Sequence, residues 1–413
     1  MAKKTVEVEL YYERCCGLDV HKKLVTACFR DGSKQEVREF GATSKELRAL
    51  SVWLIERRCE MVAMESTGSY WKPVYNILEL YGIDIMVVNA HHVKNVPGRK
   101  TDKGDAKWLS KLLAQGLLKP SYVPDKEQRE LREVTRYRKS LTEERARELN
   151  RLSKMLESAN IKLTSVLTDV LGRSSRRLLE AALSGEPLDN VTVEGLLTKQ
   201  MSGKSALLTE AMDGFLSKTQ RLLVKAVLDH IDDMTQRIAD LDNIVKGEMQ
   251  KYEAAIDLLD GVDGVGRASA EVILAEIGLD MGRFATAKHL AAWSGLCPGN
   301  NESANKSRNC KTRKGNITLK ATLVQCAQSA VKKKGTFLRA QYDRLVVRRG
   351  KGRALVAVAH SMIIAIWHML STGVTFKDLG GDYYNRFNPE KKIAMHLKKL
   401  EELGWKPPIT AIA

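Results

Sequence analysis

The chain has 413 residues, of which 44% are hydrophobic and 28% are charged, and its formal net charge is +17. This length exceeds one ordinary core, so two or three domains are expected, and the composition excludes an intrinsically disordered chain. The positive charge implies a polyanionic partner, either a nucleic acid or an acidic membrane surface.

No stretch of the sequence approaches the roughly 20 apolar residues of a membrane span, and the N-terminal MAKKTVEVEL lacks the core of a signal peptide. We therefore expect no membrane partner, and a cytoplasmic, nucleoid-associated protein. The seven cysteines form no CxxC pair, so neither a disulfide framework nor a zinc knuckle is indicated, and they are interpreted as reduced, small hydrophobic residues.

The N-terminal part alternates strand and helix patterns. Segments 15–30 and 35–42 are typical of short strands, and Ser44 is predicted to cap an amphipathic helix that follows them. Apolar runs at 61–66 and 83–90 predict further strands, separated by a helix at 70–81. This order favours a mixed sheet with helices on its faces, close to the ribonuclease-H type of α/β fold.

Four acidic residues lie in or next to these predicted elements. Asp19 lies inside the first strand, in GLDVHKK, between Leu18 and Val20, where a carboxylate costs several kcal/mol unless it is paired. Glu65 ends the apolar run at 61–66. Asp102 and Asp105 open a helix in TDKGDAKWLSKLL, and their spacing of three puts both on one helical face.

These acids allow two interpretations. Asp102 and Asp105 could simply cap the helix, because acids suit a helix N-terminus. Alternatively, four carboxylates could converge beyond the carboxyl ends of the strands, where ligands bind in open α/β sheets. Such a cluster would repel itself without hard cations, and oxygen-only ligation fits Mg²⁺ or Mn²⁺. The sequence favours this metal site over the capping interpretation.

Charged helical sequence with regular leucines begins near residue 126. A second long helix carries apolar residues at alternating spacings of three and four, which is typical of a coiled-coil seam: Val224, Val227, Ile231, Met234, Ile238, Leu241 and Val245. A helical hairpin folded on itself explains the pattern as well as a seam between protomers does. A homo-oligomer, dimer or tetramer, is therefore plausible from the sequence but not required.

The segment 258–278 contains GVDGVGRASA between two apolar stretches. This pattern matches a helix-hairpin-helix, in which Gly264 and Gly266 let backbone N–H groups approach a phosphate near Arg267. Glycine turns also join helices that bind nothing. The strongly basic segment that follows favours the nucleic-acid interpretation.

From Lys306 to Arg353 there are 15 Lys or Arg residues and one acid, Asp343. A dense surface of one sign repels itself unless a polyanion neutralises it, so phosphate contacts are expected here. Five of these cations directly follow Ser303 in a polar loop: Lys306, Arg308, Lys311, Arg313 and Lys314. A serine attacks phosphorus only where a base or a metal takes its proton and cations hold the developing charge.

Taken together, GLDVHK, AMESTG, VVNAHHVKNVPGRKTDKGDA, GVDGVGRASA and LAAWSGLCPGNNESANKSRN followed by TRKGN resemble the DEDD transposases of bacterial insertion sequences, the IS110 group. The resemblance covers residues 15 to 380 approximately. It implies a RuvC-like domain whose acids are Asp19, Glu65, Asp102 and Asp105. It also implies a catalytic Ser303, with Ser307 as the fallback because Ala304 stands where the family often has glycine.

The resemblance further implies DNA strand exchange through a phosphoserine intermediate. The partners would be double-stranded DNA at the element ends and the target, and a structured non-coding guide RNA. In an oligomer, the acids of one protomer would meet the serine domain of another. Predicted boundaries are a RuvC-like domain at 1–125, a helical coiled-coil region at 126–252, a transposase domain at 253–380 and a tail at 381–413.

The sequence leaves two competing functions open. In a metal-dependent junction nuclease, the acids alone would activate water and Ser303 would be incidental, which predicts free ends and no covalent adduct. In a non-catalytic nucleic-acid scaffold, the helix-hairpin-helix, the basic segment and the coiled coil would serve binding alone. That alternative predicts that changes at the acids leave every activity intact.

Overall fold

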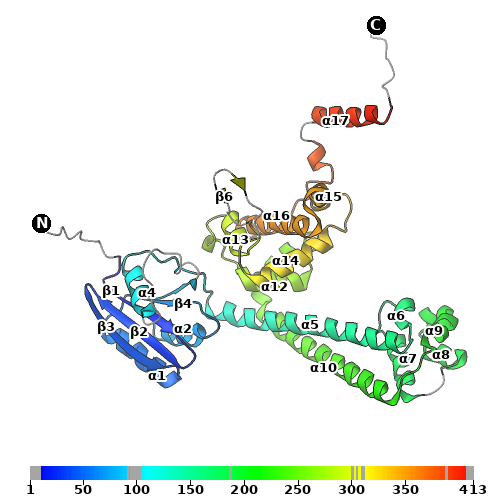
Figure 1. The fold of residues 1–413 in the computed structure, drawn as a ribbon, viewed down its shortest axis with the longest axis horizontal. Helices are drawn as coiled ribbons and strands as arrows, with labels where there is room; N and C mark the ends of the chain where they lie inside the picture. The colour runs from blue at the N-terminus through cyan, green and yellow to red at the C-terminus, as the bar shows by residue number, and fades with distance from the viewer. Residues whose placement is uncertain are drawn as a thin grey trace, which may run out of the picture. The chain divides into compact units, whose positions relative to one another are not determined.

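A computed structural model gives the fold of the chain (Figure 1), and it describes residues 11–90, 93, 104–185, 188–298, 302–303, 306–307, 312–386 and 389–405. Asp102, Arg308 and Lys311 lie outside the described residues. The chain divides into two compact units, Met1–Asp125 and Lys126–Ala413. The finer division of the second unit at residues 252 and 380 stays a prediction.

The first unit is a mixed α/β unit built on a five-stranded sheet of order β3-β2-β1-β4-β5. Its elements are β1 (Arg14–Val20), β2 (Leu24–Asp31), β3 (Lys34–Gly41), α1 (Ser44–Glu56), β4 (Met61–Glu65), α2 (Trp71–Leu80), β5 (Ile85–Val88) and α4 (Asp105–Ala114). The first three strands pair antiparallel, whereas β1 with β4 and β4 with β5 pair parallel. The predicted order of strands and helices is confirmed.

The two faces of this sheet are covered by different helices. Because side chains alternate along a strand, Leu18 and Met64 lie on the face that packs against α1 and α2. Cys15 and Ala63 lie on the opposite face, which packs against α4. The prediction that Ser44 caps α1 was wrong by one residue, because the Thr43 side chain accepts the Glu46 N–H at 3.4 Å.

The second unit is mostly helical. Its elements are α5 (Lys126–Ser158), α6 (Leu163–Val166), α7 (Arg173–Ser184), α8 (Asn190–Leu196), η1 (Lys199–Lys204), α9 (Ser205–Met212), α10 (Lys218–Glu248), η2 (Gln250–Tyr252), α11 (Glu253–Asp260), α12 (Arg267–Ile277), η3 (Met281–Arg283), α13 (Ala287–Trp293), β6 (Glu302–Ser303), β7 (Lys306–Ser307), α14 (Ile317–Ala330), α15 (Phe337–Arg349), α16 (Lys351–Thr372), η4 (Tyr383–Asn385) and α17 (Pro389–Glu402).

Helices α5 and α10 pack side by side as a long hairpin whose far end carries the short helices α6 to α9 (Figure 1). The buried residues of α10 include Val224, Ile231, Met234 and Val245, which belong to the predicted seam. That seam therefore packs within its own chain, as the hairpin interpretation expected. A Ser217 capping box begins α10, because Ser217 and Gln220 each bond the backbone N–H of the other.

Helix α16 lies among α13, α14 and α15 and forms the centre of the C-terminal helices. Within the described ranges it is the one helix long and apolar enough to cross a membrane. The prediction that no stretch approaches such a span was therefore wrong for this helix. In the structure this helix packs against α13, α14 and α15, and a helix that packs against neighbours on several sides is apolar over much of its surface.

Candidate active site

Three of the four predicted acids are placed by the described residues, and the sheet register brings two of them together. Strands β1 and β4 run parallel with Leu18 opposite Met64, so Asp19 and Glu65 follow as the next neighbours on adjacent strands. Adjacent strands lie about 4.8 Å apart. By alternation from Cys15 and Ala63, both acids belong to the face that α4 covers.

Gly17 lets α4 lie directly against this face. A Cβ atom at residue 17 would stand 2.3 Å from the Ala106 carbonyl oxygen and 2.5 Å from the Ser110 backbone nitrogen. Only glycine permits this approach. Asp105, the first residue of α4, precedes Ala106 in the chain, so it begins the helix on the face that also carries Asp19 and Glu65.

The carboxylates have contrasting surroundings. His21 Nε2 lies 3.1 Å from Asp19 Oδ2, within hydrogen-bonding distance. The Asp19 side chain is 24% exposed. Glu65 Oε1 and Asp105 Oδ1 are both buried atoms. The backbone of Gly104, not Asp105, occupies the N-cap position of α4, so Asp105 is a first-turn acid and not the cap.

Among the described residues, which do not include Asp102, no group of three or more His, Cys, Asp or Glu side chains is close enough to hold a metal ion. The geometry therefore gives three acids on one face rather than a closed ligand shell. His21 was not singled out from the sequence. The sequence feature that could have identified His21 is its position two residues after Asp19, because the side chains of residues i and i+2 in an extended segment point the same way.

The segment with the candidate nucleophile forms a small hairpin. Strands β6 and β7 pair antiparallel, with Ser303 opposite Lys306 and Glu302 opposite Ser307. We call β6 and β7 the serine hairpin. Both candidate serines thus lie in its strands, while Arg313 and Lys314 follow as exposed residues.

Two chain segments, 293–298 and 312–316, form the base of the serine hairpin. Pro298 pairs with Thr312, and the Arg313 N–H donates to the Cys297 carbonyl at 3.2 Å. A Cβ atom at Gly315 would stand 2.3 Å from the Gly295 nitrogen. The two backbone segments of the base therefore lie so close together that any side chain larger than hydrogen at Gly315 would push them apart.

Helices α11 and α12 are joined by the glycine turn that the sequence indicated. At Gly264, where φ is +84°, a Cβ atom would stand 2.4 Å from the Cys326 carbonyl, so this glycine permits close packing against α14. Gly266 faces open space and is the N-cap of α12. The Arg267 guanidinium donates hydrogen bonds to the Glu253 carboxylate, and these, with a smaller contribution from Glu271, raise the pKa of Arg267.

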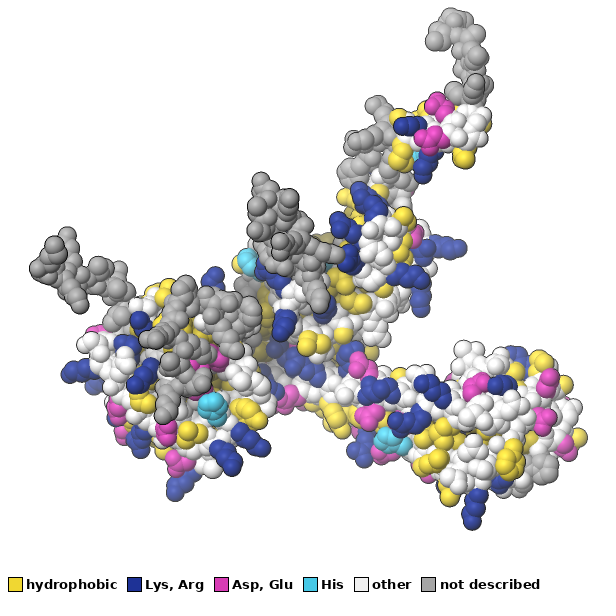
Figure 2. Space-filling model, in the orientation of Figure 1, with side chains coloured by type: hydrophobic (Ala, Val, Ile, Leu, Met, Phe, Trp, Pro, Cys, Tyr) yellow, Lys and Arg dark blue, Asp and Glu magenta, His cyan; other side chains and the backbone are white. Residues whose placement is uncertain are grey.

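Exposed cations gather over α15 and the start of α16, as the dark blue side chains of Figure 2 show. The exposed ones are Arg344, Arg348, Arg349, Lys351 and Arg353. The Arg344 guanidinium also lies 4.8 Å from the centre of the Tyr384 ring. This part of the predicted basic segment therefore presents its charge to solvent.

Comparison with known proteins identifies the family. Residues 16–161 match a family model of IS110-type DEDD transposases, and residues 256–343 match the Transposase IS116/IS110/IS902 family. The transposase for insertion sequence element IS1111A of Coxiella burnetii (strain RSA 493 / Nine Mile phase I) is 23% identical over 327 residues, which cover 76% of this chain and 79% of that protein.

Two proteins of Sinorhizobium fredii (strain NBRC 101917 / NGR234) that carry transposase names are also similar. The first, y4qE, is 23% identical over 77% of this chain and 72% of its own length. The second, y4rJ, is 26% identical over 75% of this chain and 76% of its own length. The chain belongs to the IS110 family of DEDD transposases and is a DNA-processing enzyme of an insertion sequence.

Proposed function

We propose that this transposase cuts and rejoins DNA strands through a covalent bond between Ser303 and DNA, assisted by the carboxylates of Asp19, Glu65, Asp102 and Asp105. The observation that carries the proposal is the register of β1 and β4. It brings Asp19 and Glu65 together on the face of the sheet that α4 covers, and Asp105 is the first residue of α4.

The first unit supports a RuvC-like assignment, that is, the ribonuclease-H type of fold. Its sheet continues an antiparallel meander with two parallel strands, and helices cover both faces. In such sheets the space beyond the carboxyl ends of the parallel strands is where ligands bind. Asp19 lies near the carboxyl end of β1, and Glu65 is the last residue of β4.

The donor set fits a divalent cation. All four candidate ligands are carboxylates, and Mg²⁺ and Mn²⁺ prefer oxygen ligands. When bound, such a cation supplies Lewis-acid stabilisation of charge on the phosphate oxygens. The role of this chain is to hold the carboxylates on a rigid frame, and the close fit of Gly17 against α4 provides that rigidity for Asp105.

In the proposed cleavage step, Ser303 Oγ forms a bond to phosphorus while a bond from phosphorus to a deoxyribose oxygen breaks. The serine proton passes to a base, and the departing oxygen receives a proton. Lys306, Arg308, Lys311, Arg313 and Lys314 hold the DNA backbone and stabilise the negative charge of the transition state. Because the phosphoserine keeps the energy of the phosphodiester, the reverse step rejoins strands without ATP.

Nucleic acid is the partner that the remaining surface favours. The turn with Gly264, Gly266 and Arg267 and the exposed cations of α15 would extend backbone contacts, and their sequence-independent character suits a guide RNA as well as DNA. A dimer or tetramer, in which the acids of one protomer meet the serine hairpin of another, completes the proposal.

The test is incubation of the full-length protein with element-end DNA and Mg²⁺, with and without the transcript of the element, followed by denaturing electrophoresis. We expect a shifted covalent species with the wild-type protein and with Ser307→Ala. We expect none with Ser303→Ala, which should still bind DNA. Adducts at normal yield in Ser303→Ala would contradict the role of this serine, and free cut ends without any adduct would indicate the nuclease alternative.

A further inference from the structure

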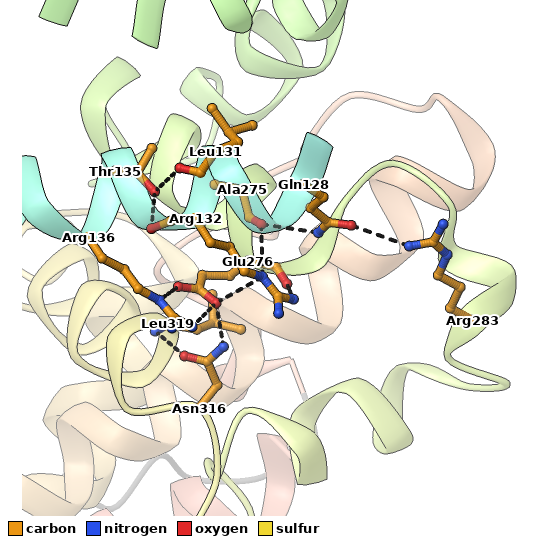
Figure 3. A network of polar contacts seen from close by, with 10 residues as sticks. All are labelled: Gln128, Leu131, Arg132, Thr135, Arg136, Ala275, Glu276, Arg283, Asn316 and Leu319. Carbon is orange, nitrogen blue, oxygen red and sulfur yellow. Dashed lines mark hydrogen bonds and ion pairs between the residues drawn. The ribbon is translucent and has the colours of Figure 1, made fainter. Parts of the chain in front are cut away.

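A network of polar groups connects α5 and α12 to the start of α14 (Figure 3). At its centre is Glu276 of α12, whose side chain is 0% exposed. Arg136 donates to its two carboxylate oxygens at 2.6 and 2.8 Å. Arg132 Nε lies 3.4 Å from Glu276 Oε2, so two guanidinium groups of α5 neutralise one buried carboxylate.

The same carboxylate also holds the residue that starts α14. Asn316 Nδ2 donates to Glu276 Oε2 at 2.6 Å, while Asn316 Oδ1 accepts the Leu319 N–H at 3.0 Å as the N-cap of α14. The Asn316 backbone N–H donates to the Trp293 carbonyl at 3.1 Å. Asn316 therefore connects Glu276 to both segments of the base of the serine hairpin.

Arg132 provides a second connection from α5 to that base. Its guanidinium donates to the backbone carbonyls of Ala275 and Glu276, and it lies 5.7 Å from the centre of the Trp293 ring. Trp293 is the first residue of the base segment 293–298. Arg136, through Glu276 and Asn316, therefore connects α5 to the base of the serine hairpin. Arg132, through the Trp293 ring, makes a second connection.

We infer that Glu276 is a positioning residue that fixes the base of the serine hairpin against α5. Buried ion pairs are often replaceable by apolar groups without loss of stability, so a network of this kind is better explained by the geometry that it specifies. Helix α5 begins at Lys126, directly after the unit that carries the acids. Through this network, α5 sets the position of the serine hairpin within the second unit, to which both belong.

The inference rests on the proposed role of Ser303, because it assigns to Glu276 the alignment of that hydroxyl with a phosphate. A displacement of a reacting group by 1 Å can lower a rate by about 100-fold. Loss of the network should therefore slow formation of the covalent bond while DNA binding, which depends on exposed cations, is retained.

The chain offers variants that separate positioning from stability. Asn316→Ser keeps an oxygen to cap α14 but removes the amide Nδ2 that donates to Glu276, and Glu276→Gln keeps the shape but removes the charge. Glu271→Gln is the matched control. Glu271 is also on α12 and nearly buried, at 6% exposure, and its carboxylate pairs with Arg138 of α5 at 2.7 Å and with Arg267 at 3.1 Å.

The first measurement does not depend on chemistry. Backbone hydrogen exchange of the full-length protein reports on the amides of residues 313 and 316, which donate to Cys297 and Trp293. We expect exchange about five- to tenfold faster in Asn316→Ser and Glu276→Gln, the effect of weakening one ordinary hydrogen bond. The Glu271→Gln control should leave these amides at the wild-type rate.

The second measurement is the initial rate of adduct formation on element-end DNA, beside the dissociation constant for the same DNA. We expect rates about 10- to 100-fold lower in Asn316→Ser and Glu276→Gln, with dissociation constants within about twofold of wild type. Wild-type exchange and wild-type rates in both variants would overturn the inference. An equal loss of rate in Glu271→Gln would also overturn it, because the effect would then be one of general stability.

The two proposals can fail separately. If the wild-type protein forms no adduct, the proposed role of Ser303 fails, while the exchange of residues 313 and 316 still decides whether Glu276 fixes the base. If adducts form and the exchange pattern is unchanged in Asn316→Ser, the positioning role of Glu276 fails and the function of Ser303 stands.

Discussion

Gly17→Ala should separate α4 from the sheet and so move Asp105. The added Cβ atom would stand 2.3 Å from the Ala106 oxygen, 2.5 Å from the Ser110 nitrogen and 2.9 Å from the Leu109 Cβ. Two of these atoms are backbone atoms, which cannot rotate away as the end of a side chain can. Ordinary Cβ contacts begin at 3.4 Å, so α4 must retreat from β1 by about 1 Å.

Overpacking of this kind costs about 1 to 3 kcal/mol of unfolding free energy, and the backbone contacts favour the upper end of that range. The same displacement of Asp105 should lower the rate of DNA cleavage by about 100-fold. Urea unfolding, followed by hydrogen exchange of the β1 and α4 amides, measures the unfolding free energy of the first unit. Cleavage is then measured at a temperature at which the variant remains folded.

Gly247→Ala is the matched control, because Gly247 lies in α10 and a Cβ atom there meets nothing within 4 Å. This change should stabilise the helix by up to about 1 kcal/mol and leave cleavage unchanged. Wild-type stability and wild-type cleavage in Gly17→Ala would refute the reasoning, since the helix would then not depend on the missing side chain at residue 17.

Three further predictions concern the acids, the basic surface and the thiols. Asp105→Asn, or EDTA with the wild-type protein, should lower cleavage by at least about 100-fold without a change in melting temperature, and undiminished recombination in EDTA would exclude the metal. Replacing both Arg348 and Arg349 by alanine should lower the salt slope of DNA binding, measured by titration at several salt concentrations, by about 2; an unchanged slope would place the DNA elsewhere. Burial raises the pKa of the Cys15 and Cys59 thiols to about 12, so both should stay protonated and resist alkylation in the folded protein at pH 8. They should become reactive as the pH approaches 12 or when the first unit unfolds. Rapid alkylation of the folded protein at pH 8 would contradict this prediction.

The elements of the first unit could be predicted because their signals are local. Alternating and continuous apolar residues indicate the strands. The strand that ends at Glu65 can therefore be predicted from its own residues, without knowledge of residues far away in the sequence. The starting residue of α1 could not be chosen, because Thr43 and Ser44 both have hydroxyl groups able to cap a helix. The three-four spacing on α10 showed which face is buried, yet the same spacing fits a partner within the chain or in another chain.

The candidate site was predictable in kind but not in geometry. The sequence indicated Asp19, Glu65 and Asp105 as candidate acids, whereas the close approach at Gly17 appears only in the structure, where α4 packs on β1. Glu276 and Arg136 are separated by 140 residues, and no pattern in the sequence connects them. The apolar length of α16 is visible in the sequence, but hydropathy does not show what the apolar side chains contact, so it does not distinguish a helix packed among others from one that crosses a membrane.

The most direct test of the central claim is mass spectrometry of the protein–DNA adduct after nuclease and trypsin digestion. Trypsin cleaves after Lys288 and Lys306, so Ser303 falls in peptide 289–306 and Ser307 falls in the next one. We predict a nucleotide remnant on peptide 289–306, with fragment ions that assign it to Ser303. A remnant on Ser307 or on any other residue, or cut DNA with no modified peptide, would contradict the account.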